Sequence, residues 1–264
     1  MRFRLTLTIN KGSRNSNLLP LNYQYEFSSW IYHTIHYGNK EFADWLHEQG
    51  YTKNGKKFKL FTFSNVDVPE YKIVGDRLNI LCNEVCLYVS FYPIEALEHF
   101  ISGLFRNQEF TIGDKKSRVA FYVKTVEKIV EPEFYDEMTF KSLSPILVSY
   151  KKNSEKKYAE YLLPEGEKYK ELFLNNLLVK YNSYNTDLDM INMIYNMDIL
   201  SKPKSRLITI KANTPHESKL RGYLFDFKIN APAEIVKLGY YAGFGEKNSL
   251  GFGCCEVNER MKHF

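Results

Sequence analysis

The 264-residue sequence has few cysteines and no long apolar segment. Its four cysteines are too few and too irregularly spaced for a disulfide framework, and no His or Cys pair at zinc spacing accompanies them. They are Cys82, Cys86, Cys254 and Cys255. The first ten residues alternate as a strand does and lack the apolar core of a signal peptide. We therefore expect a cytoplasmic protein in a reducing compartment, with no membrane span, no metal and no cofactor.

The sequence also lacks the two common phosphate-binding glycine loops, although glycine is frequent in the C-terminal stretch "GYYAGFGEKNSLGFGCCEV". No Gly-Lys-Ser/Thr ending opens a helix there, and no Gly-x-Gly-x-x-Gly fingerprint occurs. Instead Gly243, Gly245, Gly251 and Gly253 flank a short polar segment between a predicted helix and a final strand. Such glycines allow backbone N–H groups to approach a phosphodiester, and Lys247 adds a cation. A tight hairpin without a ligand is the alternative.

Basic and aromatic side chains are abundant. Lys and Arg outnumber Asp and Glu by 36 to 31, and aromatic residues make up 16% of the chain. This balance permits a polyanionic partner, and aromatic faces can fill a core or stack on unpaired bases. Composition alone therefore admits nucleic-acid binding without proving it.

The hydrophobic pattern predicts an α+β fold of two tandem ferredoxin-like (RRM-like) domains, each with the order βαββαβ. In the first domain we expect strands at 1–10, 58–66, 77–82, 85–92 and 117–130, with helices at 23–38, 40–50 and 93–107. In the second we expect strands at 140–150, 158–164, 205–213, 221–230 and 251–259, with helices at 167–185 and 231–243. Gly38 is predicted to stop a helix and Asn39 to cap the next. Because "VEPEFYDEM" interrupts the pattern, the domains span 1–132 and 133–264.

The glycine-rich stretch closely resembles the C-terminal loop of the CRISPR-associated repeat-processing endoribonucleases, the Cas6 family. The resemblance extends to "LPLNYQYEFSSWIYHTI", "ADWLHEQG", "FKLFTFS" and "FKSLSPILV", and covers most of the chain. It implies cleavage of CRISPR precursor RNA within its repeats to give mature guide RNAs. The implied reaction needs no metal: the 2′-hydroxyl attacks the neighbouring phosphate, leaving a 2′,3′-cyclic phosphate and a 5′-hydroxyl.

The same resemblance implies that Tyr32, His47 and Lys59 are catalytic. If two short helices fold back at the predicted turn, Tyr32 and His47 lie about six and eight residues from it, at similar depth. We expect His47 to be the general acid because histidine changes protonation near neutral pH, with His36 and His33 as competitors. Tyr32 either accepts the 2′-hydroxyl proton or orients that group, since a phenol ionises only well above neutral pH.

Lys59 is expected to stabilise the charge that builds up on the phosphate. The insertion "YTKNGKKF" lengthens the segment before it relative to the family pattern, so Lys56 and Lys57 remain alternatives. The resemblance also implies RNA-binding residues in the loop, namely Gly243, Gly245, Lys247, Asn248, Ser249, Gly251 and Gly253.

The implied partner is single-stranded or hairpin repeat RNA, bound by a monomer or homodimer that also contacts other CRISPR effector-complex subunits. The alternative function is a non-catalytic CRISPR RNA-binding protein of the same fold. The candidate catalytic residues Tyr32, His47 and Lys59 favour the enzyme over the non-catalytic binding protein.

Overall fold

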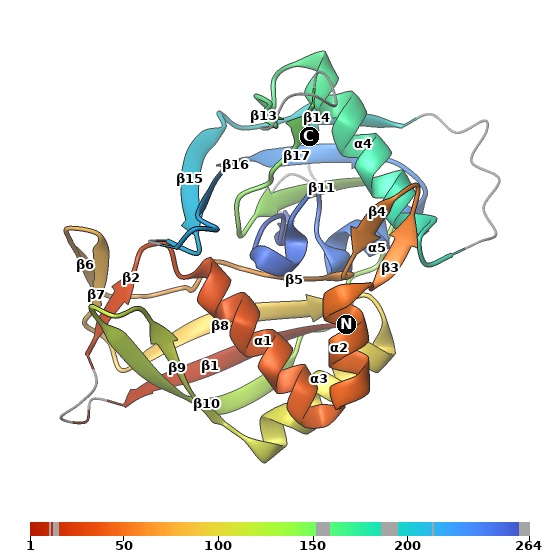
Figure 1. Cartoon of the computed structure of the whole chain (residues 1–264). Coiled ribbons are helices and arrows are strands. Elements are labelled where there is room, and N and C mark those ends of the chain that lie inside the picture. The colour runs from red at the N-terminus through yellow and green to blue at the C-terminus, as the bar shows by residue number, and fades with distance from the viewer. Residues whose placement is uncertain (11, 13–15, 152–158, 186–194, 213, 259–264) are drawn as a thin grey trace.

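A computed structural model describes residues 1–10, 12, 16–151, 159–185, 195–212 and 214–258. Over these residues the protein is a mixed α and β structure with five α-helices, and its strands pair antiparallel throughout. Figure 1 shows most N-terminal elements in the lower half of the molecule and most C-terminal elements in the upper half. No helix in the described ranges is long and apolar enough to cross a membrane.

The N-terminal half is built on a five-stranded sheet of order β5-β8-β1-β10-β9. Its strands are β1 (Arg2–Asn10), β5 (Phe61–Phe63), β8 (Glu84–Phe91), β9 (Glu109–Gly113) and β10 (Arg118–Lys128). Strand β1 alternates as the sequence predicts, with Leu5, Leu7 and Ile9 buried and Thr6 and Thr8 on the opposite face. This alternation gives the sheet one apolar face, against which the helices pack.

Three helices supply the other side of this core: α1 (Gln24–Gly38), α2 (Lys40–Glu48) and α3 (Ile94–Arg106). Asn39 caps α2 as predicted, because its side-chain oxygen accepts a hydrogen bond from the N–H of Phe42 at 3.0 Å. The cap turns the chain sharply, so that α2 folds back beside α1 (Figure 1).

The predicted helix stop at Gly38 is confirmed, because Gly38 is the last residue of α1, although its φ is not positive as in a left-handed glycine cap. A Cβ on Gly38 would lie 2.0 Å from the carbonyl oxygen of His99, and a Cβ on Gly103 would lie 1.7 Å from that of Thr34. The two glycines therefore let the backbones of α1 and α3 approach each other closely.

The C-terminal half contains a four-stranded sheet of order β14-β17-β11-β18, formed by β11 (Glu137–Ser142), β14 (Asn196–Ile199), β17 (Asp226–Asn230) and β18 (Cys255–Val257). Helices α4 (Glu167–Tyr181) and α5 (Ala233–Ala242) pack on it around a second core. The predicted strand at 205–213, of which residue 213 lies outside the described residues, forms as β15 (Lys204–Ile210). Among the residues that the structure describes, β15 pairs only with β16 (Ser218–Leu224), in a separate hairpin. Most of β15 is exposed, so it lacks the buried face that a strand of the main sheet needs.

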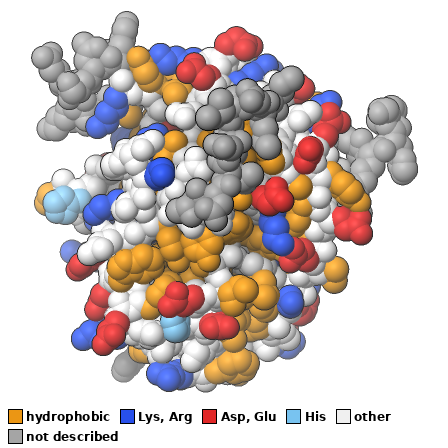
Figure 2. All heavy atoms as spheres, turned by 90° about the vertical axis from the view of Figure 1, so that its right-hand side faces the viewer, with side chains coloured by type: hydrophobic (Ala, Val, Ile, Leu, Met, Phe, Trp, Pro, Cys, Tyr) orange, Lys and Arg blue, Asp and Glu red, His pale blue; other side chains and the backbone are white. Residues whose placement is uncertain are grey.

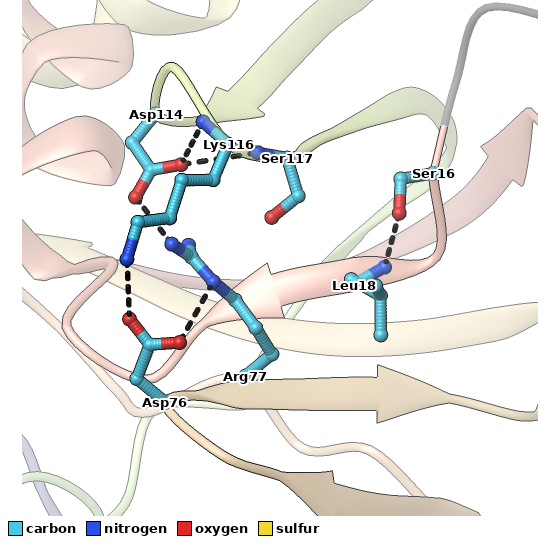
Figure 3. Close-up of polar contacts among 7 residues, drawn as sticks. All are labelled: Ser16, Leu18, Asp76, Arg77, Asp114, Lys116 and Ser117. Carbon is cyan, nitrogen blue, oxygen red and sulfur yellow. Dashed lines mark hydrogen bonds and ion pairs between the residues drawn. The ribbon is translucent and has the colours of Figure 1, made fainter.

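A smaller three-stranded sheet, β2 (Leu18–Pro20), β7 (Arg77–Ile80) and β6 (Tyr71–Val74), flanks the N-terminal half. Figure 3 shows how it is attached: the Arg77 guanidinium pairs with Asp114 in the turn between β9 and β10 at 2.7 Å, and with Asp76 at 3.3 Å. Lys116 closes the group by pairing with Asp76 at 3.7 Å. This polar group fixes the small sheet to the β9–β10 hairpin.

A buried arginine joins the two halves. The Arg2 guanidinium donates to the carbonyl oxygens of Tyr240 and Cys255, both at 2.6 Å, and stacks on the Tyr240 ring at 3.7 Å. The hydroxyl of Ser90 donates to Tyr241 O at 2.9 Å in the same interface. Strand β1 is thus tied to the end of α5 and to β18, so the halves meet through a specific polar interface.

Aromatic rings also bridge the halves. Tyr51 of β3 (Tyr51–Lys53) lies between Trp45 of α2 and Tyr184 after α4, with ring centroids 5.1 and 5.3 Å away. Figure 2 shows the side of the molecule that carries β3 and β4 (Lys56–Phe58), where hydrophobic side chains gather across the middle. Acidic and basic side chains are interspersed around them in the visible part of this face, so no surface of one charge sign is seen there.

Candidate functional site

A cleft of about 1150 Å³ lies between the N-terminal helices and the glycine-rich loop. Seven lysines and two acidic residues line it. The lysines are Lys56, Lys57, Lys59, Lys151, Lys180, Lys211 and Lys247, and the acids are Asp44 and Glu246. This excess of positive charge suits a polyanionic ligand.

Tyr32 and His47 meet at this cleft. Their ring centroids are 5.2 Å apart and the rings are nearly perpendicular, at 84°. Tyr32 projects from α1 and His47 from the last turn of α2, and the turn at Asn39 brings the two helices side by side. The predicted pairing of these side chains is therefore confirmed. His47 is exposed and free to meet a ligand, whereas the Tyr32 ring is largely covered.

Burial raises the pKa of Tyr32 to about 12, although a hydrogen bond with the Ser249 side chain opposes the shift. The phenol therefore stays neutral at physiological pH. It can donate a hydrogen bond to a ligand oxygen, but it is a poor acceptor of a proton.

The inserted segment before Lys59 folds as a hairpin of β3 and β4. Asn54 and Gly55 form its turn with φ values of 51° and 71°, the left-handed conformation that an Asn-Gly hairpin turn requires. The hairpin returns the chain to the end of α2, so the extra residues do not displace Lys59 from His47.

The Lys59 ammonium donates to the carbonyl oxygens of Leu46 and His47, the latter at 2.7 Å. Lys57 donates instead to Glu48 O at 2.8 Å, and Lys56 is exposed. Both bonded lysines thus lie at the negative end of the α2 dipole. Of the three predicted candidates, Lys59 is the one bonded to the backbone of His47.

Burial, and then repulsion from Lys57, lower the pKa of Lys59 to about 8. The group is still a cation at neutral pH, but it loses its proton about two pH units earlier than an ordinary lysine. A cation whose charge is so poorly compensated by nearby anions is well suited to meet a phosphate.

His33 and His36 are both exposed and line the same cleft. Within the described ranges, however, the ring contact of Tyr32 with a histidine is with His47 alone. No group of three or more His, Cys, Asp or Glu side chains in these ranges could hold a metal ion.

The glycine-rich loop is mostly buried. Four of its glycines have φ between 69° and 90°, which other residues rarely adopt: Gly243, Gly245, Gly251 and Gly253. Each also lies against another group, so a Cβ on Gly253 would be 1.8 Å from Phe244 O and one on Gly251 would be 2.6 Å from the Phe63 ring. The glycines are thus required by the shape of the loop itself.

The expectation that these glycines offer backbone donors to RNA does not fit Gly243, Gly251 and Gly253, whereas Gly245 lines the cleft. All four are buried, and three of their N–H groups already donate within the protein at 2.9 to 3.0 Å. The donor and acceptor pairs are Gly243 with Gly239, Gly251 with Asn248 and Gly253 with Pro145. Of the predicted loop residues, Lys247 is the exposed one.

Known families match both halves of the chain. The family described as CRISPR-associated protein Cas6, N-terminal, matches residues 18–127, and that described as CRISPR associated protein Cas6, C-terminal, matches residues 129–257. The CRISPR-associated endoribonuclease Cas6 1 of Methanocaldococcus jannaschii is 31% identical over 255 residues, covering 96% of this chain and 92% of that relative. The chain belongs to the Cas6 family. The predicted family is therefore confirmed.

Solved structures agree with the Cas6 assignment. One titled as the characterization of a Cas6-related gene from Pyrococcus furiosus has a TM-score of 0.82 at 27% identity, covering 98% of both chains. Another, titled as an RAMP protein binding different RNA substrates, has a TM-score of 0.81 at 27% identity and covers 98% of this chain and all of that one. The Cas6 fold therefore extends over the whole described chain.

One residue at this Cas6 site was not predicted from the sequence. Lys180 is buried with an exposed fraction of 1%, and its ammonium bonds to the glycine-rich loop. It follows Phe173 by seven residues and Leu177 by three, which places it on the buried face of α4. The sequence did contain a signal that could have revealed Lys180, namely a lysine on the apolar face of a predicted helix.

Proposed function

We propose that this protein, a CRISPR-associated endoribonuclease of the Cas6 family, cleaves repeat RNA without a metal ion. The 2′-hydroxyl of the RNA attacks the adjacent phosphate, and the products carry a 2′,3′-cyclic phosphate and a 5′-hydroxyl. The observation that carries this proposal is the convergence of Tyr32, His47 and Lys59 on one lysine-lined cleft. The three side chains offer a neutral hydrogen-bond donor, a titratable group and a cation, which this reaction requires.

The geometry supports distinct roles for the three groups. His47 is exposed in the cleft and protonates the leaving 5′ oxygen. Lys59 lies beside it and stabilises the charge on the crowded phosphate. Tyr32 orients the 2′-hydroxyl rather than taking its proton, because its raised pKa keeps the phenol neutral. The 2′-hydroxyl proton passes to water in the cleft as its oxygen bonds to phosphorus and the bond to the 5′ oxygen breaks.

We further propose two tandem ferredoxin-like domains, 1–132 and 133–264. The strand orders β5-β8-β1-β10 and β14-β17-β11-β18 support this proposal. In each, the strands of a βαββαβ unit lie in the spatial order second, third, first, fourth, with β15 and β16 as an added hairpin in the second unit. The two family matches meet between residues 127 and 129, close to the proposed boundary.

We place the repeat RNA in the cleft, with Lys247 and Ser249 on its wall. The lysine excess supports this placement, as does the similarity to a structure titled for RNA binding. The four free cysteines support a reducing compartment, which we take to be the cytoplasm. Three expectations stay predictions. They are that the repeat RNA is single-stranded or a hairpin, that the protein is a monomer or homodimer, and that it contacts other effector subunits.

The product ends test the mechanism. The protein is incubated with its own repeat RNA in EDTA, and in parallel with RNA carrying one 2′-deoxy nucleotide at the scissile position. We expect full cleavage in EDTA, a 2′,3′-cyclic phosphate on the product, and no cleavage of the deoxy RNA although it still binds. A strict need for a divalent ion, or cleavage of the deoxy RNA, would refute the mechanism. Binding without any cleavage would favour the non-catalytic alternative.

A further inference from the structure

The middle of the glycine-rich loop reaches the proposed reaction centre. Ser249, in the short 3₁₀ helix Asn248–Leu250, lines the same cleft as Tyr32, and its side chain interacts with the Tyr32 hydroxyl and opposes the rise in the pKa of that group. The position of the Tyr32 hydroxyl is therefore coupled to the position of this loop. A residue that holds this loop in place therefore also affects how Tyr32 is positioned for RNA cleavage.

Lys180 is the group that fixes it. From α4 its ammonium donates to Gly243 O at 2.6 Å, Gly245 O at 3.0 Å and Asn248 Oδ1 at 2.7 Å. An ammonium has three N–H bonds, and each finds an oxygen here. The carbonyls of Gly243 and Gly245 lie before the 3₁₀ helix and the Asn248 side chain lies within it, so one buried cation holds both parts of the loop.

Asn248 carries this restraint across the loop. Its side-chain amide nitrogen donates to Phe244 O and Phe252 O, both at 3.0 Å, while its oxygen accepts from Lys180. The Asn248 side chain thus joins the loop segments before and after the 3₁₀ helix and ties both segments to α4. Ser249 is its immediate neighbour in the chain.

We propose that Lys180 is a positioning residue for RNA cleavage: through Asn248 and the glycine carbonyls it holds Ser249 where it can orient the Tyr32 hydroxyl. This inference rests on the proposed function. Lys180 itself does not act on the RNA. Burial lowers its pKa to about 7, although Glu246 opposes the shift, so charging this buried amine has a desolvation cost that its three oxygen acceptors offset.

The test compares Lys180→Met with Lys170→Met. Lys170 lies on the same helix but makes a surface pair with Glu167 at 3.5 Å. Single-turnover cleavage of repeat RNA at saturating protein is measured beside the dissociation constant for uncleaved 2′-deoxy RNA. We expect Lys180→Met to cleave about 10-fold to 100-fold more slowly with affinity changed less than about threefold, because a misplaced group lowers the rate more than the binding. Lys170→Met should match the wild type.

A double-mutant cycle with Ser249→Ala separates positioning from a purely structural role. If Lys180 acts through Ser249, the double variant is no slower than Lys180→Met, so the two effects do not add. The inference would be overturned if the rate losses of Lys180→Met and Ser249→Ala multiplied in the double variant, or if folded Lys180→Met cleaved at the wild-type rate. If Lys180→Met does not fold, Asn248→Ala takes its place in the cycle with the same expectations. Cleavage at the wild-type rate by His47→Ala would instead overturn the proposed function itself.

Discussion

The ammonium of Lys59 donates to the carbonyl oxygen of His47 at 2.7 Å, which places a cation directly beside the proposed general acid. The pKa of Lys59 is lowered to about 8 by burial and by Lys57, so its charge is present below that pH and is lost as the pH rises through it. The loss of the Lys59 charge therefore predicts how the cleavage rate changes at alkaline pH.

We expect the single-turnover cleavage rate to fall as the pH rises above about 8. In Lys59→Arg the guanidinium stays charged to much higher pH, so whatever activity that variant retains should not show this decline. Rates of both proteins measured from pH 6 to 10 at saturating protein check the prediction. The same alkaline decline in both would mean that another group controls it.

Replacing His47 by alanine should slow cleavage by about 10² to 10⁴, the usual contribution of one general acid or base, with RNA affinity within a few-fold of the wild type. His36→Ala is the matched control, because His36 is an exposed histidine of the same cleft. It should cleave nearly normally. If the two variants exchanged behaviour in a single-turnover assay, His36 would be the acid.

Gly253→Ala should destabilise the fold far more than Gly55→Ala. Both glycines have a positive φ, 74° and 71°, so both substitutions cost about 1 to 2 kcal/mol of backbone strain. The new Cβ at Gly55 meets nothing within 4 Å, whereas at Gly253 it meets a backbone oxygen at 1.8 Å. Urea unfolding of the two variants measures the difference; equal midpoints would show that the loop adjusts without cost.

Arg2→Met should lower the free energy of unfolding by about 3 kcal/mol, because two charged hydrogen bonds are lost and two carbonyl oxygens stay buried without them. Arg4→Met is the control on the same strand. Its side chain is 39% exposed and pairs with Glu127 at 3.4 Å, so it should cost less than about 1 kcal/mol. Similar losses in urea unfolding would argue against Arg2 as the link between the halves.

Local signals in the sequence determined the helices and their turn. Asn39 precedes a helical pattern and its side-chain oxygen can accept from the N–H groups that follow it, so the cap and the pairing of Tyr32 with His47 could be predicted. The sequences of the glycine-rich loop and of the N-terminal helices were likewise enough to identify the family. Each of these features depends on residues close together in the chain, or on a motif that repeats in order.

The tertiary structure decided which distant groups meet. Neither the short strand β14 nor the separate β15–β16 hairpin was predicted, because strand pairing depends on partners far along the chain. Which of the three candidate lysines bonds the backbone of His47 depended on where a hairpin returned the chain. The close contacts of Gly38 and of the loop glycines with other parts of the protein depended on the tertiary structure for the same reason: a glycine pattern shows that space or an unusual φ is needed, but not which group fills that space. Lys180 binds carbonyls more than 60 residues away, a contact that exists only once α4 and the loop have packed in the second core.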